Sequence, residues 1–301
     1  MTPILPTSRA NPIDGVLLVD KPAGVSSHDV VLVARRALEE RRVGHAGTLD
    51  PFATGLLVLL TGRATRLLPY IDGEPKVYDA TVRFGDETDT DDLSGAVIRS
   101  APPPAESVAR AHVGELTGDF LQRPPAYSAK RVGGGGRRAY HAARAGEELD
   151  LSPVRVRVHE WRVHRWREVE GSRAEMEVTI VCAGGTYVRA LARDLGRLAG
   201  SAAHLSALRR VRSGRFSVDE ATPLETLRTG GVAPRPAVDA LGGMPVQTLD
   251  TADARRIERG LTIAVGVEGE RAALVTEAGA LLAVAVRQGG QWQPRVVLHD
   301  D

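Results

Sequence analysis

The sequence predicts an α+β protein with a mixed or mostly antiparallel sheet and a small β-rich domain at its C-terminal end. Three observations support this class. Apolar and polar residues alternate over 155–164 and 174–181, which is the period of strands, and we expect these two strands to pair antiparallel. Apolar residues recur at helical spacing over 29–40 and 186–198. Glycine and proline accumulate over 229–236, as in a linker, and further short strand patterns follow.

The N-terminal part is expected to begin with a tail, 1–12, whose prolines and missing apolar segment argue against a signal peptide. A short buried strand is predicted over 15–20. Ser26 or Ser27 can cap the helix over 29–40, because serine side chains accept hydrogen bonds from the free amides of a first helical turn. The next strands are predicted over 56–60 and 77–84.

The middle of the chain is irregular between its predicted strands. An acidic loop is expected over 86–92, a proline-rich segment over 101–105 and a four-glycine run over 133–136. The alternation in the strand over 155–164 slips between Val158 and Trp161, which indicates a bulge or a bend.

Two domains are predicted, a main one over 13–235 and a smaller one over 244–301. In the smaller domain a helix near 252–259 is followed by strand patterns at 261–265, 272–276, 281–286 and 295–298.

Composition sets few limits. With 43% hydrophobic and 26% charged residues among 301, the chain is an ordinary globular protein. The longest apolar run, 56–60, is too short to cross a membrane, so no membrane association is expected. Cys182 is the single cysteine, which excludes an intrachain disulfide and fits a reducing cytosol. We therefore expect a cytoplasmic protein, and a monomer is the default oligomeric state.

The kind of cation is more unusual than the net charge of +1. Lysine occurs only at 21, 76 and 130, so 36 of the 39 basic residues are arginine. Codon bias in a GC-rich genome explains such a ratio. Arginine also binds phosphate bidentately and stacks on bases, so the ratio is equally compatible with an RNA partner.

The first candidate site is the loop over 42–55, which contains His45 and Asp50 among three glycines and a proline. Loops between buried elements often present functional groups, because the scaffold holds them rigidly. Glycines and an Asp-Pro pair are also common in ordinary turns. The local pattern alone leaves Asp50 open between a functional and a structural role.

The second candidate is the segment from Gly184 to Arg189, at a predicted helix start where free amides attract anions. An ordinary capped helix with a surface ion pair is the alternative. Tyr78, in Lys76-Val77-Tyr78, is a third candidate, although a single strand tyrosine usually serves packing.

No cofactor is predicted. The histidines form no His-x-x-x-His pair on a helix and have no partner cysteines, so a metal site is not expected. The acidic segment 86–92 lacks the glycine and glutamate spacing of an EF-hand. Glycine patterns for nucleotide binding and a serine-hydrolase elbow are missing as well. Any chemistry would then depend on side chains alone.

Five segments in order closely resemble the TruB family, the tRNA pseudouridine-55 synthases: 15–27, 44–55, 76–78 with 88–91, 123–129 and 185–189. The resemblance covers roughly 13–220, and the tail from 244 is similar to the small RNA-binding PUA-type domain of many bacterial members. It implies a pseudouridine-synthase-like sheet flanked by helices and loops, and a PUA-like C-terminal domain. It also implies an enzyme that binds the T-stem-loop of tRNA and converts the uridine at position 55 to pseudouridine without a cofactor.

The resemblance also implies roles for single residues. Asp50 matches the shared catalytic aspartate, which starts cleavage of the glycosidic bond by attacking the base, by attacking the sugar or by proton transfer. Arg189 matches the arginine that pairs with it. Tyr78 matches the aromatic residue that stacks on the target base, and His45 the residue that fills the gap left in the RNA loop.

Further residues follow from the same comparison. Lys21 and Asp92 match supporting positions of the active site, and Tyr187 is expected at the RNA. Arg209 and Arg210 are expected either to contact phosphates or to be simple surface charges. One departure is clear: Lys130 directly follows the Tyr-Ser-Ala segment, and the glycine run over 133–136 is lengthened, so the conformation of this loop does not follow from the family.

Two other functions fit parts of the sequence. A pseudouridine synthase acting on ribosomal RNA or directed by a guide RNA would share the aspartate but surround it with Arg-Leu-Asp, whereas this chain has Gly-His-Ala-Gly-Thr-Leu-Asp. A non-catalytic RNA-binding or tRNA-folding protein would be favoured by the loss of Asp50, Tyr78 or Arg189, and all three are present.

Overall fold

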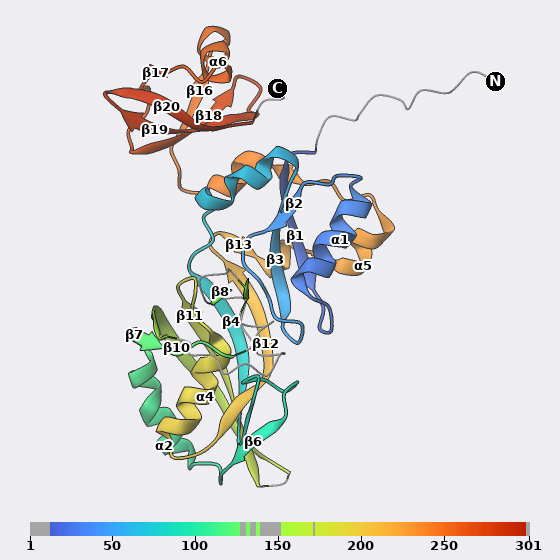
Figure 1. Cartoon of the computed structure of the whole chain (residues 1–301), viewed down its shortest axis with the longest axis vertical. Helices are drawn as coiled ribbons and strands as arrows, with labels where there is room; N and C mark the ends of the chain where they lie inside the picture. The colour runs from blue at the N-terminus through green and yellow to red at the C-terminus, as the bar shows by residue number, and fades with distance from the viewer. Residues whose placement is uncertain (1–12, 127–130, 133–136, 139–151, 171, 299–301) are drawn as a thin grey trace, which may run out of the picture.

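The computed structural model describes residues 13–126, 131–132, 137–138, 152–170 and 172–298 (Figure 1). The glycine run over 133–136 and Lys130 lie outside the described residues. The described part contains a large mixed sheet with helices around it and a smaller C-terminal sheet at one end of the molecule. The predicted α+β class, with a mixed, mostly antiparallel main sheet and a small β-rich C-terminal domain, is confirmed.

The main sheet has 11 strands in the described part of the chain. They are β1 (Gly15–Lys21), β2 (Val43–His45), β3 (Thr54–Thr61), β4 (Lys76–Phe84), β7 (Gly118–Gln122), β10 (Val154–Val169), β11 (Arg173–Cys182), β12 (Ala203–Ser213), β13 (Phe216–Ser217), β14 (Thr222–Pro223) and β15 (Arg235–Pro236). The main path runs β14–β1–β3–β12–β4–β11–β10–β7. Among the described strand pairs of this sheet, only β1–β14 and β3–β12 are parallel.

The helices and short hairpins are attached to this sheet. The α-helices are α1 (Ser27–Ala37), α2 (Glu106–His112), α4 (Val188–Leu198) and α5 (Leu224–Thr229), and the 3-10 helices are η1 (Gly62–Tyr70), η2 (Val113–Leu116), η3 (Val218–Glu220) and η4 (Ala237–Leu241). The hairpins are β5 (Asp86–Thr88) with β6 (Val97–Ser100), and β8 (Arg131–Val132) with β9 (Arg137–Arg138). The largest apolar cluster joins α1, α4 and α5 to β1, β3, β4, β11 and β12.

Two half-sheets meet at a narrow junction between β3 and β12. Only Arg209 with Thr54 and Arg210 with Gly55 pair there among the described residues. Gly55 has a φ of +98°, and a Cβ at this position would collide with the backbone of Arg210. Glycine is therefore required by both conformation and space. The junction brings the loop before β3 next to β12.

The C-terminal domain has its own sheet, formed by β16 (Val246–Leu249), β17 (Ile263–Ala264), β18 (Arg271–Thr276), β19 (Leu281–Gln288) and β20 (Gln291–Val297), with α6 (Thr251–Glu258) beside it. The fully buried Trp292 lies in the core of this domain. Val284 and Val296 join a second apolar cluster that includes Leu60 and Leu67 of the main domain. The two domains therefore share buried apolar surface.

Several sequence-based details need correction. The first helix begins at Ser27, with Ser26 as a cap that forms a reciprocal capping box with Asp29, and it ends at Ala37 rather than near residue 40. The helix expected over 186–198 begins at Val188. The predicted bulge is present, as a register shift between Val158 and Glu160 opposite β11.

Two larger differences concern segments interpreted as loops. The acidic segment over 86–92 contains β5, and Glu87 in it is only 2% exposed. The linker over 229–236 ends in β15, which pairs with β1 and so belongs to the main sheet. The long strand β12 was not predicted at all, because its inward residues include Arg210 and His204 instead of an apolar series.

Candidate active site

Asp50 lies in the loop between β2 and β3, and hydrogen bonds fix the backbone on both sides of it. The Ser27 hydroxyl donates to the carbonyl of Leu49 at 2.9 Å and accepts from its amide at 2.8 Å. The amide of Gly24 donates to the carbonyl of Pro51 at 2.8 Å. The Asp50 side chain remains 35% exposed. The carboxylate is thus held in place and still open to a substrate.

Arg189, in the first turn of α4, holds this carboxylate in a bidentate pair. Its Nε lies 2.9 Å from Oδ2 of Asp50, and its Nη2 donates to Oδ1 at 3.0 Å. The third nitrogen, Nη1, donates to the carbonyl of Thr90 at 2.7 Å and lies 3.5 Å from Oδ2 of Asp92. Two parallel charge-assisted bonds fix direction as well as distance. The sequence-based pairing of Asp50 with Arg189 is present in the structure.

Opposing influences act on the pKa of Asp50. Burial is the largest and raises the pKa above its ordinary value, and the neighbouring Asp92 adds to the rise. Arg189 is the next largest and lowers the pKa, and Lys21 acts in the same direction. A nearby cation favours the ionised carboxylate, whereas burial disfavours it. The net rise makes Asp50 a more basic carboxylate whose ionisation depends on Arg189.

Lys21 binds the backbone next to Asp50. Its side chain is fully buried, and its ammonium donates to the carbonyls of Pro22 at 2.9 Å, Val25 at 2.8 Å and Pro51 at 3.3 Å. Burial lowers the pKa of Lys21 to about 8, against the opposing effect of Asp50. These contacts make Lys21 a positioning residue for the backbone next to Asp50.

Asp92 supports the site through Arg189. It is 4% exposed, and its Oδ1 accepts hydrogen bonds from the hydroxyl of Thr90 at 2.8 Å and from the amide of Ser94 at 2.9 Å. Its other oxygen faces Arg189. Asp92 therefore helps to orient the arginine that holds Asp50.

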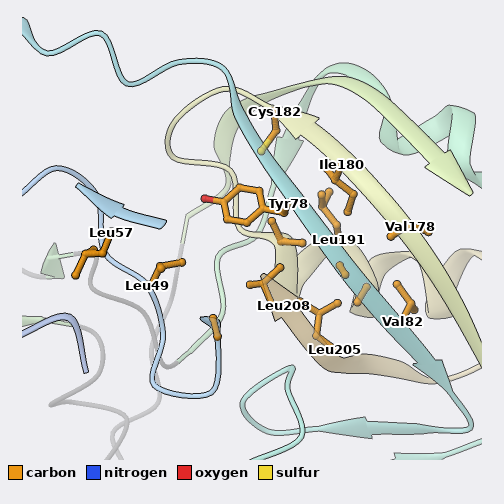
Figure 2. Packing of buried hydrophobic residues seen from close by; sticks show 14 of the residues in the cluster. Leu49, Leu57, Tyr78, Val82, Val178, Ile180, Cys182, Leu191, Leu205 and Leu208 are labelled. Carbon is orange, nitrogen blue, oxygen red and sulfur yellow. The ribbon is translucent and has the colours of Figure 1, made fainter. Parts of the chain in front are cut away.

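Tyr78 belongs to the largest apolar cluster and lies between Leu49 and Leu57 on one side and the cluster residues of β11 and β12 on the other (Figure 2). The ring packs among the residues of that cluster, and the hydroxyl points toward the side on which Leu49 and Leu57 lie. The residue is 7% exposed. Burial raises the pKa of the Tyr78 phenol, and the neighbouring Arg210 lowers it. A neutral aromatic side chain is therefore present close to the loop of Asp50.

Arg210 does not have the role expected from the sequence. Its side chain is fully buried, with Nε donating to the carbonyl of Leu56 at 2.8 Å and Nη2 to that of Gly47 at 3.1 Å. A longer bond of 3.4 Å reaches the carbonyl of Thr48. A contact with RNA phosphates does not fit this burial, so we reassign Arg210 to support of the loop that carries Asp50.

Arg209 is placed differently, because successive strand residues face opposite sides. It pairs with Asp20 at 2.8 and 3.0 Å, and its side chain is 41% exposed. It lines an open pocket together with Phe52 and Thr54. Arg209 remains accessible to a partner, and its expected contact with RNA remains a prediction.

His45 and Tyr187 belong to the two segments that lead to Asp50 and to Arg189. His45 is the last residue of β2, opposite Leu59, and is half-buried. Tyr187 precedes α4. The side-chain amide of the buried Gln122 accepts a hydrogen bond from the backbone amide of Tyr187 at 2.9 Å and donates one to its carbonyl at 3.0 Å. Gln122 was not predicted from the sequence, since nothing near it indicates a partner 65 residues away.

A row of arginines on α4 explains the acidic segment. Arg189, Arg193 and Arg197 stand one helical turn apart. Arg193 pairs with Asp91 at 2.9 Å, and Arg197 pairs with the buried Glu87. The acidic residues thus serve as anions for the helix that carries Arg189.

Among the described residues no group of three or more side chains suited to a metal ion occurs.

Comparison with known proteins identifies the family. The model of the TruB family pseudouridylate synthase N-terminal domain matches residues 35–188, and that of the tRNA pseudouridylate synthase B C-terminal domain matches 189–232. The chain belongs to the TruB family. The tRNA pseudouridine synthase B of Thermobifida fusca (strain YX) is 43% identical over 289 residues, covering 94% of this chain and 98% of that one. The protein of the same name from Rhodococcus jostii (strain RHA1) is 45% identical over 266 residues, covering 86% of each.

Solved structures agree on the fold. A chain of the archaeal box H/ACA sRNP Nop10-Cbf5 complex superposes with a TM-score of 0.67 at 23% identity, covering 95% of this chain and 86% of that one. As a TruB-family member the chain is a pseudouridine synthase, and the site around Asp50 lies within the matched residues. No helix in the described part of the chain is long and apolar enough to cross a membrane.

Proposed function

We propose that this TruB-family enzyme converts the T-loop uridine at position 55 of tRNA to pseudouridine, with Asp50 as its catalytic residue. The observation that carries the proposal is the carboxylate of Asp50, 35% exposed and held bidentately by Arg189. The name of the two relatives compared above, tRNA pseudouridine synthase B, supports tRNA as the substrate.

The reaction is an isomerisation, so its atoms balance within the uridine. The bond from the ribose C1′ to N1 of the base breaks, a bond from C1′ to C5 forms, and the proton of C5 is lost as N1 gains one. Asp50 must be ionised to act as a nucleophile or as a base. Arg189 serves this requirement, because its cation favours the carboxylate.

The target uridine must first leave the base stack, since Asp50 cannot reach it inside a folded RNA loop. Flipping a base costs a few kcal/mol (about 2–4) in lost stacking and pairing. Tyr78 is an aromatic residue near the Asp50 loop and would stack on the flipped base. His45 would fill the gap that the base leaves. Both roles reduce the cost of flipping.

The rest of the RNA would lie along the edges of the site. Arg209 and Tyr187 are the residues we assign to RNA contact, and the C-terminal domain is proposed as a PUA-like RNA-binding unit. No cofactor is required by this reaction. We also propose that the enzyme works in the cytoplasm as a monomer.

A single-turnover assay on unmodified tRNA tests the proposal. Wild type and Asp50→Ala are compared, and the modified nucleotide is mapped by carbodiimide treatment and primer extension. Pseudouridine at position 55 with wild type only is the expected result. Product on ribosomal RNA but not on tRNA would overturn the substrate, and product from both proteins would overturn the assignment of Asp50.

A further inference from the structure

A further cation, Lys76, lies next to the site and has no assigned role. It is the first residue of β4, two positions before Tyr78, so the two side chains leave the same face of the strand. Two residues along a strand span about 7 Å. This is comparable to the reach from a nucleobase to the phosphate of its own nucleotide. Lys76 and the ring proposed to stack on the base therefore stand a nucleotide's length apart.

The ammonium of Lys76 lies between two glycine-containing segments of the site. A Cβ built on Gly47 would be 3.2 Å from its Nζ, and one built on Gly184 would be 3.7 Å from it. Gly47 lies in the loop of Asp50, and Gly184 lies in the segment that leads to Arg189. Because both neighbours lack side chains, the ammonium is close to the backbone of both segments and is not covered by them.

Lys76 also differs from the other cations of the site in its hydrogen bonds and ion pairs. Arg189 is paired with carboxylates, and Lys21 and Arg210 donate to backbone carbonyls. Within the described residues, the Lys76 ammonium forms no hydrogen bond and no ion pair. Glu74, a carboxylate that acts electrostatically on Lys76, accepts a hydrogen bond from the amide of Gly184 at 2.8 Å.

The local charge favours an added anion. Burial lowers the pKa of Lys76, and the cation of Arg210 lowers it further, while Cys182 and Glu74 raise it less. An ammonium in these surroundings is destabilised by loss of water and by a like charge. A phosphate next to it would reverse both effects, because it supplies the opposite charge and new acceptors.

We propose that Lys76 binds a backbone phosphate of the RNA at the flipped uridine, and so holds that nucleotide over Tyr78 and beside Asp50. The inference rests on the proposed function, since it needs an RNA substrate at this site. Lys76 is a substrate-binding residue in this view and does not touch the bond that is broken.

The first test compares Lys76→Gln with wild type in tRNA binding at several salt concentrations. Loss of one phosphate contact reduces the slope of log Kd against log salt by about 0.7–0.9. We expect that reduction and a Kd raised about tenfold at moderate salt. Lys76→Arg should keep the slope, because the cation is retained.

Arg83→Gln is the matched control, since Arg83 lies at the far end of β4 in an ion pair with Glu175 and loses the same charge. Its slope should equal that of wild type. An unchanged slope in Lys76→Gln would overturn the proposal. So would equal slope losses in both variants, which would indicate a general charge effect.

The second test removes the phosphate instead of the lysine. Neutral methylphosphonate linkages are placed singly on either side of the target uridine in a T-stem-loop RNA. One linkage should weaken binding by wild type about as much as Lys76→Gln does, and it should cost Lys76→Gln nothing further. Additive losses at both positions would overturn the contact. Failure of the proposed function would look different, because wild type would then form no pseudouridine in the unmodified RNA.

Discussion

Replacing Arg189 by glutamine tests how the site keeps Asp50 ionised. The change removes a cation that is 6% exposed, together with contacts of 2.9 and 3.0 Å to one carboxylate. A hydrogen bond to a charged group contributes about 1.5–3 kcal/mol. Because the Asp50 side chain is 35% exposed, solvent replaces part of what is lost, and we take one such bond as the net loss. That predicts a fall in kcat/KM of about 10- to 150-fold at neutral pH.

The pH profile separates the effect of charge from that of geometry. Burial raises the pKa of Asp50 and Arg189 lowers it, so removing Arg189 raises the pKa further. Since the ionised form reacts, the acid limb of kcat/KM moves to higher pH in Arg189→Gln, and the deficit shrinks as pH rises. Arg189→Lys keeps the cation without the bidentate fork. Its acid limb should stay near that of wild type while its rate is lower at every pH.

The assay is single-turnover release of tritium from tRNA labelled at C5 of uridine, measured across the pH range in which each variant stays folded. Arg197→Gln is the control, because it removes an arginine of the same helix that pairs with Glu87. Its acid limb should coincide with that of wild type. An unmoved limb in Arg189→Gln would refute the argument that Arg189 controls ionisation.

Three further predictions concern the supports of the site. Burial raises the pKa of Asp91 to about 6, so the contribution of Asp91 to stability falls by about 3 kcal/mol as pH rises from about 4 to 6. The difference in the free energy of urea unfolding between wild type and Asp91→Asn should change by that amount over this range, and parallel curves for the two proteins would contradict it. Arg210→Lys leaves buried carbonyls without donors and should lower the free energy of unfolding by about 2–4 kcal/mol. The change Arg209→Gln, at a more exposed arginine, should lower it by less than about 1 kcal/mol. Equal losses in the two variants would show that the buried contacts of Arg210 contribute no more than an exposed ion pair. Ending the chain after Gly243, beyond η4, should weaken tRNA binding more than it slows single-turnover chemistry, and an unchanged Kd would exclude a role of the C-terminal domain in binding.

The sequence predicted those elements whose pattern is local. The apolar run of β3 and the alternation of β10 and β11 need no knowledge of distant partners. β12 has no such pattern, because buried Arg210 is satisfied by carbonyls about 160 residues earlier in the chain. The acidic segment has no local strand pattern either, because the arginine that pairs with Glu87 lies 110 residues further on.

In the site, too, local patterns could be interpreted from the sequence, whereas contacts between distant residues could not. The local pattern around Asp50 was equally consistent with an ordinary turn, and only the resemblance to the TruB family favoured catalysis. The pair with Arg189 joins residues 139 positions apart, which spacing alone cannot indicate. Gln122 and Arg193 were not predicted, because each acts on the site through a backbone or side-chain contact that exists only in the folded chain.

The narrow junction between β3 and β12 has a consequence for when the enzyme becomes active. Asp50 belongs to the half that contains β3, whereas Arg189 and Tyr78 belong to the half that contains β12 and β4. The ion pair of the site can form only after the halves have joined at Gly55, where no side chain is tolerated. Modification of a uridine therefore reports that the whole main domain has assembled, and an incompletely folded chain has no competent site with which to attack RNA.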